Sequence, residues 1–269
     1  YHAVLGGADL MLALGQLGAM ENASGPLDLS QYTLRLLRDS DFSAPAPIAR
    51  EEGFIARSAS GEWIRTGAPD ASAEWIAEGW GGAEIRDGRL FVAPTPFGAN
   101  GDPLPAAESE RSHMVVWNRA VFPADFLLEF EVCHHGSNDG LTLFFFCATG
   151  LEGEDLFDMA LPVRRADYPL YHSDRLRCYS LSYWSRNRGE QDALKDERFT
   201  ARLRRNPGKR QVAWGPSRTL GSTEKSRTVR LLKAGARIEA EIEGEVVLRW
   251  DDPEPPLGAG RIGLRSMSG

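Results

Sequence analysis

The stretch from residue 140 to residue 187 constrains this chain most. It opens with the apolar run Leu141–Ala148, which is short, rich in phenylalanine and bounded by glycines. A run of this length and composition predicts a strand buried on both faces rather than a helix. A long polar loop follows, and then a second predicted strand that contains Ser180, Ser182 and Trp184. Because alternate strand residues share a face, these three are expected to line a site while their apolar neighbours face a core.

The rest of the chain is a succession of short alternating strands separated by turn signals. Almost no helix-period pattern follows residue 40, and this combination is typical of two packed antiparallel sheets in an all-β jelly roll. Besides the two strands above, strands are expected at 31–39, within a hairpin at 54–64, and at 75–78, 83–85, 89–93, 114–117, 126–133, 199–204, 211–214, 228–232, 237–242, 246–250 and 261–265.

The first residues follow a different pattern. Leu10, Leu14 and Leu17 recur at helical spacing, which predicts a short amphipathic helix. We therefore divide the chain into a partly helical N-terminal extension at 1–40 and a β-sandwich domain at 41–269.

Charge and composition exclude several classes of function. The chain of 269 residues is 42% apolar and 26% charged, as in soluble globular proteins. Its net charge of −7 argues against non-specific binding to nucleic acid. No apolar run approaches the roughly 18 residues that span a bilayer, so no membrane partner is expected. Cys133, Cys147 and Cys178 match no zinc spacing and are predicted to be free thiols.

Four sequence motifs occur in a fixed order: GEDLFD at 153–158, YPLYHS at 168–173, LSYWSRN at 181–187 and LRRNPG at 203–208. Together they resemble the YesU-like family, a bacterial domain of unknown function. The resemblance extends over roughly residues 70–269. It implies the concanavalin A-like lectin/glucanase fold and, by analogy with the family's place in gene clusters for pectin use, a role with rhamnogalacturonan or a related polysaccharide. The same fold also carries lectins, glucanases and lyases, so it does not fix an activity.

Two segments depart from the family pattern. The loop 134–139, with His134 and His135 at its start, is longer than is usual, and residues 1 to about 65 have no counterpart. The compartment stays open between the bacterial cytoplasm and the periplasm, and the sequence does not indicate an oligomeric state.

The strongest candidate site is a polar face on two predicted strands. One strand contributes Ser180, Ser182, Trp184 and Arg186, and the other contributes Thr200, Arg202 and Arg204. Arginine forks bind carboxylates and a tryptophan ring can stack on a sugar, so this set suits an acidic saccharide. A solvated sheet face is the alternative interpretation.

Two histidines are candidates for proton transfer, which imidazole performs well near neutral pH. His172 follows the motif Tyr-Pro-Leu-Tyr just before the second strand, and His113 lies four residues before Trp117. We predict a catalytic role for His172 and a place in the binding site for His113 and Trp117.

The acidic residues of the long loop have three interpretations. Glu152, Glu154, Asp155 and Asp158 could cap a short helix, act on or bind a sugar through Asp155 and Glu154, or hold a calcium ion. Glu78 is a weaker carboxylate candidate. We expect no metal at the site, with structural calcium left open.

These residues support two hypotheses. The first is a carbohydrate-active enzyme that cleaves an acidic, pectin-type oligosaccharide. A lyase would use His172, Tyr183, Arg186 and Arg204, and a hydrolase would use Asp155 and Glu78. The second is a non-catalytic carbohydrate-binding protein that uses the same face. In both, the expected partner is an oligosaccharide or polysaccharide, and no cofactor is required.

Overall fold

The computed structural model describes residues 3–7, 26–30, 32, 35–40, 47–95, 113–133, 140–172, 175–185, 200–216 and 226–267. The strands in its first half are β1 Ala3–Gly7, β2 Arg35–Ser40, β3 Ile48–Arg50, β4 Ile55–Arg57, β5 Trp63–Arg65, β6 Trp75–Gly79, β7 Gly82–Arg86, β8 Arg89–Ala93 and β9 His113–Asn118. Those in its second half are β10 Phe126–Val132, β11 Gly140–Gly150, β12 Leu176–Ser185, β13 Thr200–Asn206, β14 Arg210–Pro216, β15 Arg227–Ala234, β16 Arg237–Ile242, β17 Glu245–Asp251 and β18 Arg261–Met267. Two short helices are described, the 3-10 helix η1 Glu51–Gly53 and α1 Pro169–His172.

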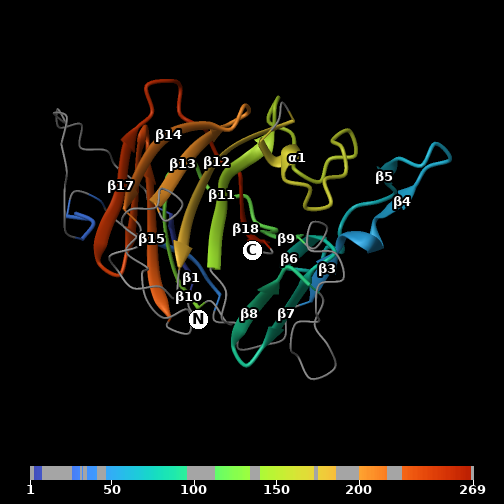
Figure 1. The fold of residues 1–269 in the computed structure, drawn as a ribbon, viewed down its shortest axis with the longest axis horizontal. Helices are drawn as coiled ribbons and strands as arrows, with labels where there is room; N and C mark the ends of the chain where they lie inside the picture. The colour runs from blue at the N-terminus through green and yellow to red at the C-terminus, as the bar shows by residue number, and fades with distance from the viewer. Residues whose placement is uncertain are drawn as a thin grey trace.

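Two large sheets form a sandwich. The six-stranded sheet has the order β17-β16-β15-β10-β1-β2, and the eight-stranded sheet has the order β14-β13-β12-β11-β18-β9-β6-β3. In Figure 1 the eight-stranded sheet runs across the molecule, with β14 at one end and β3 at the other, and α1 lies beside β11 and β12. This arrangement confirms the predicted all-β sandwich.

The core lies between the sheets because alternate residues of each strand are apolar. Phe144 and Phe146 of β11 and Tyr179 and Leu181 of β12 pack there against residues of the six-stranded sheet. Leu143 and Phe145 of the same β11 point to the other face and are also buried. The prediction of a strand buried on both faces is thus confirmed.

We call the face of the eight-stranded sheet that points away from the sandwich core the outer face. The loop 151–168, α1 and the segment 49–73 cover part of it and form a second apolar cluster. On the inner side, β6 and β9 extend beyond the six-stranded sheet, and the hairpin β7–β8 packs on them instead. The loop 151–168 thus lies directly over sheet residues, in a position to shape a site.

The N-terminal residues differ in part from the expectation of a helical extension. β1 and β2 pair with each other, and β1 also pairs with β10, so both belong to the six-stranded sheet. Leu10, Leu14 and Leu17, on which the helix prediction rests, lie outside the described residues. No helix among the described residues is long and apolar enough to span a membrane.

One strand pair differs from the predicted antiparallel sheets. β3 pairs in parallel with β6, and the chain between them forms the small β4–β5 hairpin. A parallel pair requires such a crossover, which a tight turn cannot supply. The predicted hairpin at 54–64 is this excursion.

Two of the three cysteines are buried in apolar clusters. Cys147 belongs to the core between the sheets and Cys178 to the outer-face cluster, and burial raises the pKa of each thiol to about 12. The two lie on opposite faces of the eight-stranded sheet, which separates them. Cys133 is half-buried at the end of β10.

Close packing between β18 and β9 requires a glycine. A Cβ atom at Gly263 would lie 2.4 Å from Cε3 of the buried Trp117 ring, closer than real Cβ atoms approach a side chain. We expect Gly263→Ala to lower the free energy of unfolding by about 1–3 kcal/mol through overpacking. The matched control is Gly258→Ala, whose Cβ meets nothing within 4 Å, and it should be neutral or stabilising by up to about 1 kcal/mol. Equal urea midpoints for the two variants would contradict this packing.

Candidate functional site

A buried ion-pair network joins the sheet to the loop that covers it. Glu78 of β6 is fully buried and forms an ion pair with Arg164 of the loop. Its Oε2 accepts hydrogen bonds from Tyr171 Oη at 2.5 Å, Trp117 Nε1 at 3.0 Å and Arg164 Nε at 3.2 Å. Arg65 Nη2 lies 3.9 Å from Glu78 Oε1. A buried carboxylate is stable only with partners of this kind.

This network holds α1 in place. Burial disfavours the charged form of Glu78, but Arg164, Arg65 and the two neutral donors outweigh it and keep the pKa of Glu78 below its usual value. The Tyr171 ring also packs against the rings of Phe145 and Trp117, with centroid distances of 5.4 Å and 6.3 Å, and those two rings contact each other. The residues on either side of Tyr171, including His172, are thereby fixed against the outer face.

Glu78 and Trp117 therefore have a different role from the one predicted. Both are fully buried, and the Trp117 N–H donates to Glu78 rather than to solvent. A sugar cannot reach either side chain in this structure, and we assign both to the support of the loop. Sequence spacing could not indicate this, because Arg164 follows Glu78 by 86 positions.

A second buried acid, Glu51, lies next to this network. Glu51 of η1 accepts hydrogen bonds from the backbone N–H groups of Gly79 at 3.2 Å and Arg165 at 3.4 Å. Burial, and then the like charge of Glu78, raise the pKa of Glu51 to about 7. Glu51 consequently changes charge near neutral pH, unlike Glu78.

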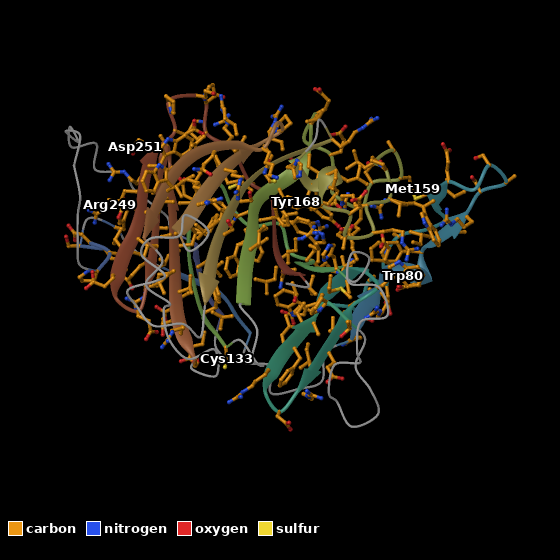
Figure 2. All side chains as sticks on the ribbon, in the orientation of Figure 1. Trp80, Cys133, Met159, Tyr168, Arg249 and Asp251 are labelled. Carbon is orange, nitrogen blue, oxygen red and sulfur yellow. The ribbon has the colours of Figure 1, made fainter. Side chains whose placement is uncertain are left out.

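Tyr168 lies at the end of the loop, beside β11 and α1 (Figure 2), and cationic side chains contact its ring. The Arg265 guanidinium lies 4.7 Å from the Tyr168 ring centroid, and the Lys209 ammonium lies 4.9 Å from it. The His172 ring packs edge-on against Tyr168 at 4.3 Å. Arg204 is close enough to influence both His172 and Tyr168 electrostatically. We call these five residues the cationic cluster.

Arg265 is the least compensated member of the cationic cluster. Only 3% of its surface is exposed, and Nε, Nη1 and Nη2 have no hydrogen-bond acceptor within the described residues. Contact with the Tyr168 and Tyr171 rings offsets part of the desolvation of this charge. A buried guanidinium normally has a carboxylate or carbonyl partner. The three nitrogens of Arg265 are themselves buried, so in this structure its charge acts on an anion bound beside it and not through a direct hydrogen bond.

The other members also lack acidic partners. Within the described part of the chain, Arg204, Lys209 and Arg265 form no ion pair with a carboxylate, and Arg204 Nη1 donates to Ser182 Oγ at 3.2 Å. Burial, and then Lys209, Arg265 and Arg204, lower the pKa of His172. His172 is therefore mostly neutral at pH 7, with one ring nitrogen able to accept a proton.

The structure thus brings together three of the predicted site residues: His172, Ser182 and Arg204. It adds Tyr168, Lys209 and Arg265, which the sequence interpretation left out. Tyr168 lies in one of the motifs used for the family resemblance and Lys209 directly follows another, so proximity to those motifs was the available signal for these two. Their convergence depends on the fold, since Arg265 comes from β18 and Lys209 from the β13–β14 turn.

The predicted acidic residues of the loop are engaged elsewhere. Asp155 forms an ion pair with Arg261 at 2.5 Å, and its other oxygen accepts from Phe157 N at 2.9 Å. Glu154 Oε2 accepts from Glu152 N at 2.8 Å, and Asp158 Oδ1 accepts from Ala160 N at 2.8 Å. These carboxylates therefore stabilise turns, not a helix. Within the described residues, no three His, Cys, Asp or Glu side chains are placed to hold a metal ion.

The remaining predicted residues are partly outside the described region. Arg186, His134 and His135 lie outside it, and so do the side chains of Tyr183 and Trp184. His113 begins β9 and is half-buried, two residues from Val115, the cross-strand partner of Arg265.

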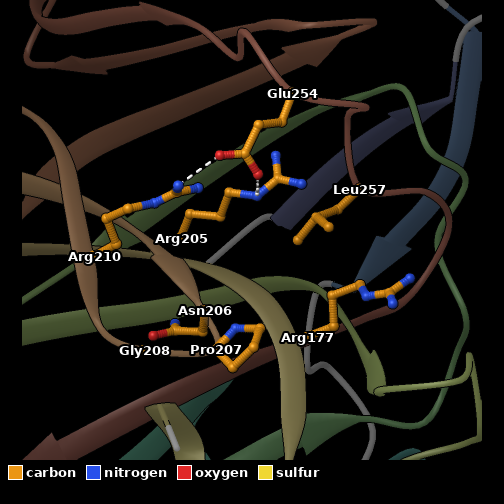
Figure 3. Close-up of a pocket in the computed structure, with 8 residues that line it drawn as sticks. All are labelled: Arg177, Arg205, Asn206, Pro207, Gly208, Arg210, Glu254 and Leu257. Carbon is orange, nitrogen blue, oxygen red and sulfur yellow. Dashed lines mark ion pairs between the residues drawn. The ribbon is translucent and has the colours of Figure 1, made fainter. Parts of the chain in front are cut away.

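A cavity of about 520 Å³ lies at the start of β12 and the end of β13, and two of its three arginines, Arg205 and Arg210, contrast with those of the cationic cluster (Figure 3). Glu254 pairs with Arg210 at 2.5 Å and with Arg205 at 3.3 Å, and Arg205 also pairs with Asp252. The positive charge of these two arginines is therefore neutralised within the protein.

Comparison with known proteins identifies relatives over most of the chain. A family model described as "Domain of unknown function (DUF1961)" matches residues 65–269. The "Uncharacterized protein YesU" of Bacillus subtilis (strain 168) is 28% identical over 201 residues, which cover 72% of this chain and 83% of that protein.

Solved structures resemble the fold. A protein of unknown function with a galectin-like fold from Bacillus subtilis is 28% identical, with a TM-score of 0.59 over 72% of this chain and 83% of that one. Lectin I-B4 from Griffonia simplicifolia is 13% identical, with a TM-score of 0.45 over 74% of this chain and 88% of that one, which is too distant to bear on function.

The raised pKa of Glu51 predicts a pH-dependent stability. Between pH 4.5 and about 7 the folded protein keeps a proton that the unfolded chain releases, so stability falls as pH rises through this window. The slope is at most about 1.4 kcal/mol per pH unit. We expect Glu51→Gln to match the wild type below pH 4.5 and to exceed its free energy of unfolding above pH 7, as measured by urea unfolding at a series of pH values.

The matched control for this prediction is the neighbouring Glu52→Gln. Glu52 is exposed and its ion pair with Arg50 is long, at 3.5 Å. Its substitution should leave the pH dependence unchanged. A Glu51→Gln variant with the wild-type slope would show that Glu51 is charged throughout this range.

Proposed function

We propose, from the premise that this chain belongs to the family described as a domain of unknown function (DUF1961), that it binds an acidic saccharide at the cationic cluster. The membership confirms the predicted family resemblance but names no activity. The proposal instead depends on one observation: Arg204, Lys209 and Arg265 converge on Tyr168 without a carboxylate partner among the described residues.

The charge balance favours a ligand with carboxylate groups. The protein as a whole carries a net charge of −7, and yet three cations without an ion-pair partner among the described residues lie together at Tyr168. Guanidinium groups bind carboxylates through paired, charge-assisted hydrogen bonds. Ser182 and the Tyr168 hydroxyl add the neutral donors and acceptors that sugar hydroxyls require. Uronates of the pectin type combine both features, in agreement with the substrate class implied by the family resemblance.

A second candidate function, cleavage by β-elimination, is favoured by His172. In this reaction a base removes the proton on C5 of a uronate, the electron pair forms a C4=C5 double bond, and the C4–O4 bond breaks. Neutral His172 would accept the C5 proton, Arg204 and Lys209 would stabilise the charge that develops on the carboxylate, and the Tyr168 hydroxyl would protonate the leaving oxygen. Hydrolysis by two carboxylates has less support, because Asp155 and Glu78 are both held in ion pairs.

The binding proposal predicts opposite effects on stability and affinity at one position. Arg265→Met removes an unpaired buried charge, so we expect the free energy of unfolding to rise by about 1 kcal/mol or more. Affinity for an oligogalacturonate, measured by titration calorimetry, should fall about tenfold or more, or about 1.4 kcal/mol, because a positive charge withdrawn from water strongly attracts a carboxylate bound beside it.

The control is Arg205→Met, a mostly buried arginine with a partner. It leaves the buried Asp252 without its counter-ion, which should lower the free energy of unfolding by about 3–5 kcal/mol and leave affinity unchanged under conditions where the variant is folded. A neutral galacto-oligosaccharide serves as the second ligand. If the wild-type protein binds it as tightly as the uronate, or if Arg265→Met binds the uronate normally, the proposal is wrong.

The elimination proposal predicts that His172→Gln abolishes turnover and retains binding. Turnover is followed by the ultraviolet absorbance of the unsaturated uronate product. Because the pKa of His172 is lowered from 6.5, wild-type activity should rise with pH through a midpoint below that value and then level off. A wild-type protein that binds oligogalacturonate without forming a double bond would exclude elimination and leave binding as its function.

A further inference from the structure

Trp214 is an exposed aromatic residue on β14, at the end of the eight-stranded sheet. Its side chain is 69% exposed, the largest exposure of any described large apolar residue. No ring or cation contact of Trp214 exists among the described residues. Most of the indole is therefore open to a ligand, and an exposed aromatic ring offers an apolar surface on which a sugar ring can stack.

The strand register places Trp214 in line with the cationic cluster. Trp214 pairs with Arg202, Arg202 with Ser182, Ser182 with Leu143, and Leu143 with Arg265. Directly paired residues of neighbouring strands project from the same face of a sheet. The five residues thus form one row across the outer face, in which Trp214 is exposed and Leu143, Ser182 and Arg265 are buried beneath the surface. It crosses four strand spacings, or about 19 Å at the usual 4.8 Å per strand.

We propose that Trp214 forms a distal stacking subsite for an acidic oligosaccharide that extends along this row from the cationic cluster. The inference rests on the proposed function. The sugar acid binds at the cationic cluster, a sugar ring further along the chain stacks on the Trp214 indole, and Arg202 and Ser182 lie between them. A single sugar bound beside Arg265 cannot span the row to Trp214, so the ligand that contacts both ends is an oligosaccharide.

The other strongly exposed tryptophan does not share this position. Trp80 is 51% exposed and lies at the opposite end of the sheet, near β3 (Figures 1 and 2). The Arg165 guanidinium lies 3.9 Å from the centroid of the Trp80 ring and 3.9 Å from that of Trp63. One face of Trp80 is thus already occupied, whereas Trp214 is free to stack. Trp80 is therefore a matched control.

The test measures how affinity depends on ligand length. Wild-type protein, Trp214→Ala, Trp214→Phe and Trp80→Ala are titrated with uronate oligosaccharides from the disaccharide upwards. Wild-type affinity should rise with length until the ligand reaches β14. Trp214→Ala should bind long ligands about threefold to tenfold more weakly, the range expected for loss of one ring contact, and bind the disaccharide normally. Trp214→Phe should restore most of the loss, and Trp80→Ala should behave as wild type.

Two outcomes overturn the inference in different ways. If Trp214→Ala binds long ligands as tightly as wild type while Arg265→Met still loses affinity, the distal subsite is excluded and the proposed function stands. If the wild-type protein binds no uronate of any length, the proposed function and the subsite both fail. Since Trp214 is exposed, its substitution should not unfold the protein, and an unchanged urea midpoint verifies this.

Discussion

The contact between Glu78 and Arg164 is the constraint on which the candidate site depends. Arg164 belongs to a loop with little regular structure, and a loop over a sheet has no ladder of hydrogen bonds to hold it. The buried ion pair, with Tyr171 and Trp117 as further donors, supplies that attachment. A buried pair of this kind adds little net stability compared with apolar packing. It does require a specific arrangement of the two side chains, because only good geometry offsets the cost of removing both charges from water. Tyr168, which directly precedes α1, and His172, its last residue, take their positions from it.

Charged residues in this protein fall into two groups. Glu78, Asp155, Arg205 and Arg261 have partners in the protein, and their removal would disturb structure. Arg265, Arg204 and Lys209 have none among the described carboxylates. Evolution for stability alone would replace or pair a buried arginine such as Arg265, since an apolar side chain of similar volume would be more favourable. An uncompensated charge is instead expected where function requires it, as active and binding sites commonly trade stability for activity.

The sequence predicted the strands well and the site only in part. Alternation along β10 or β12 reports local burial, and glycine turns mark strand ends, so both are visible in a short window. The site depends on which strands become neighbours. Glu78 and Asp155 looked like chemical groups because their partners, Arg164 and Arg261, are remote in sequence. The sequence analysis did not choose Arg265 and Lys209 as site residues, because they also approach the site only through the fold. For the same reason the sequence did not predict that β3 pairs in parallel with β6. Ser182 and Arg204 were selected from the sequence because the alternation of each strand shows which of its residues share the polar face.

The overall negative charge is compatible with an acidic ligand because electrostatic range in solution is short. At physiological salt the Debye length is about 8 Å, so carboxylates elsewhere on the surface act weakly on a ligand at the outer face. The field at the cationic cluster is set by groups within that distance. Screening is weakest for charges withdrawn from water, and Arg265 is the most withdrawn of the three cations. Burial of the Arg265 charge therefore lowers the stability of the free protein. For the same reason, Arg265 attracts a carboxylate bound beside it more strongly than the other two cations do.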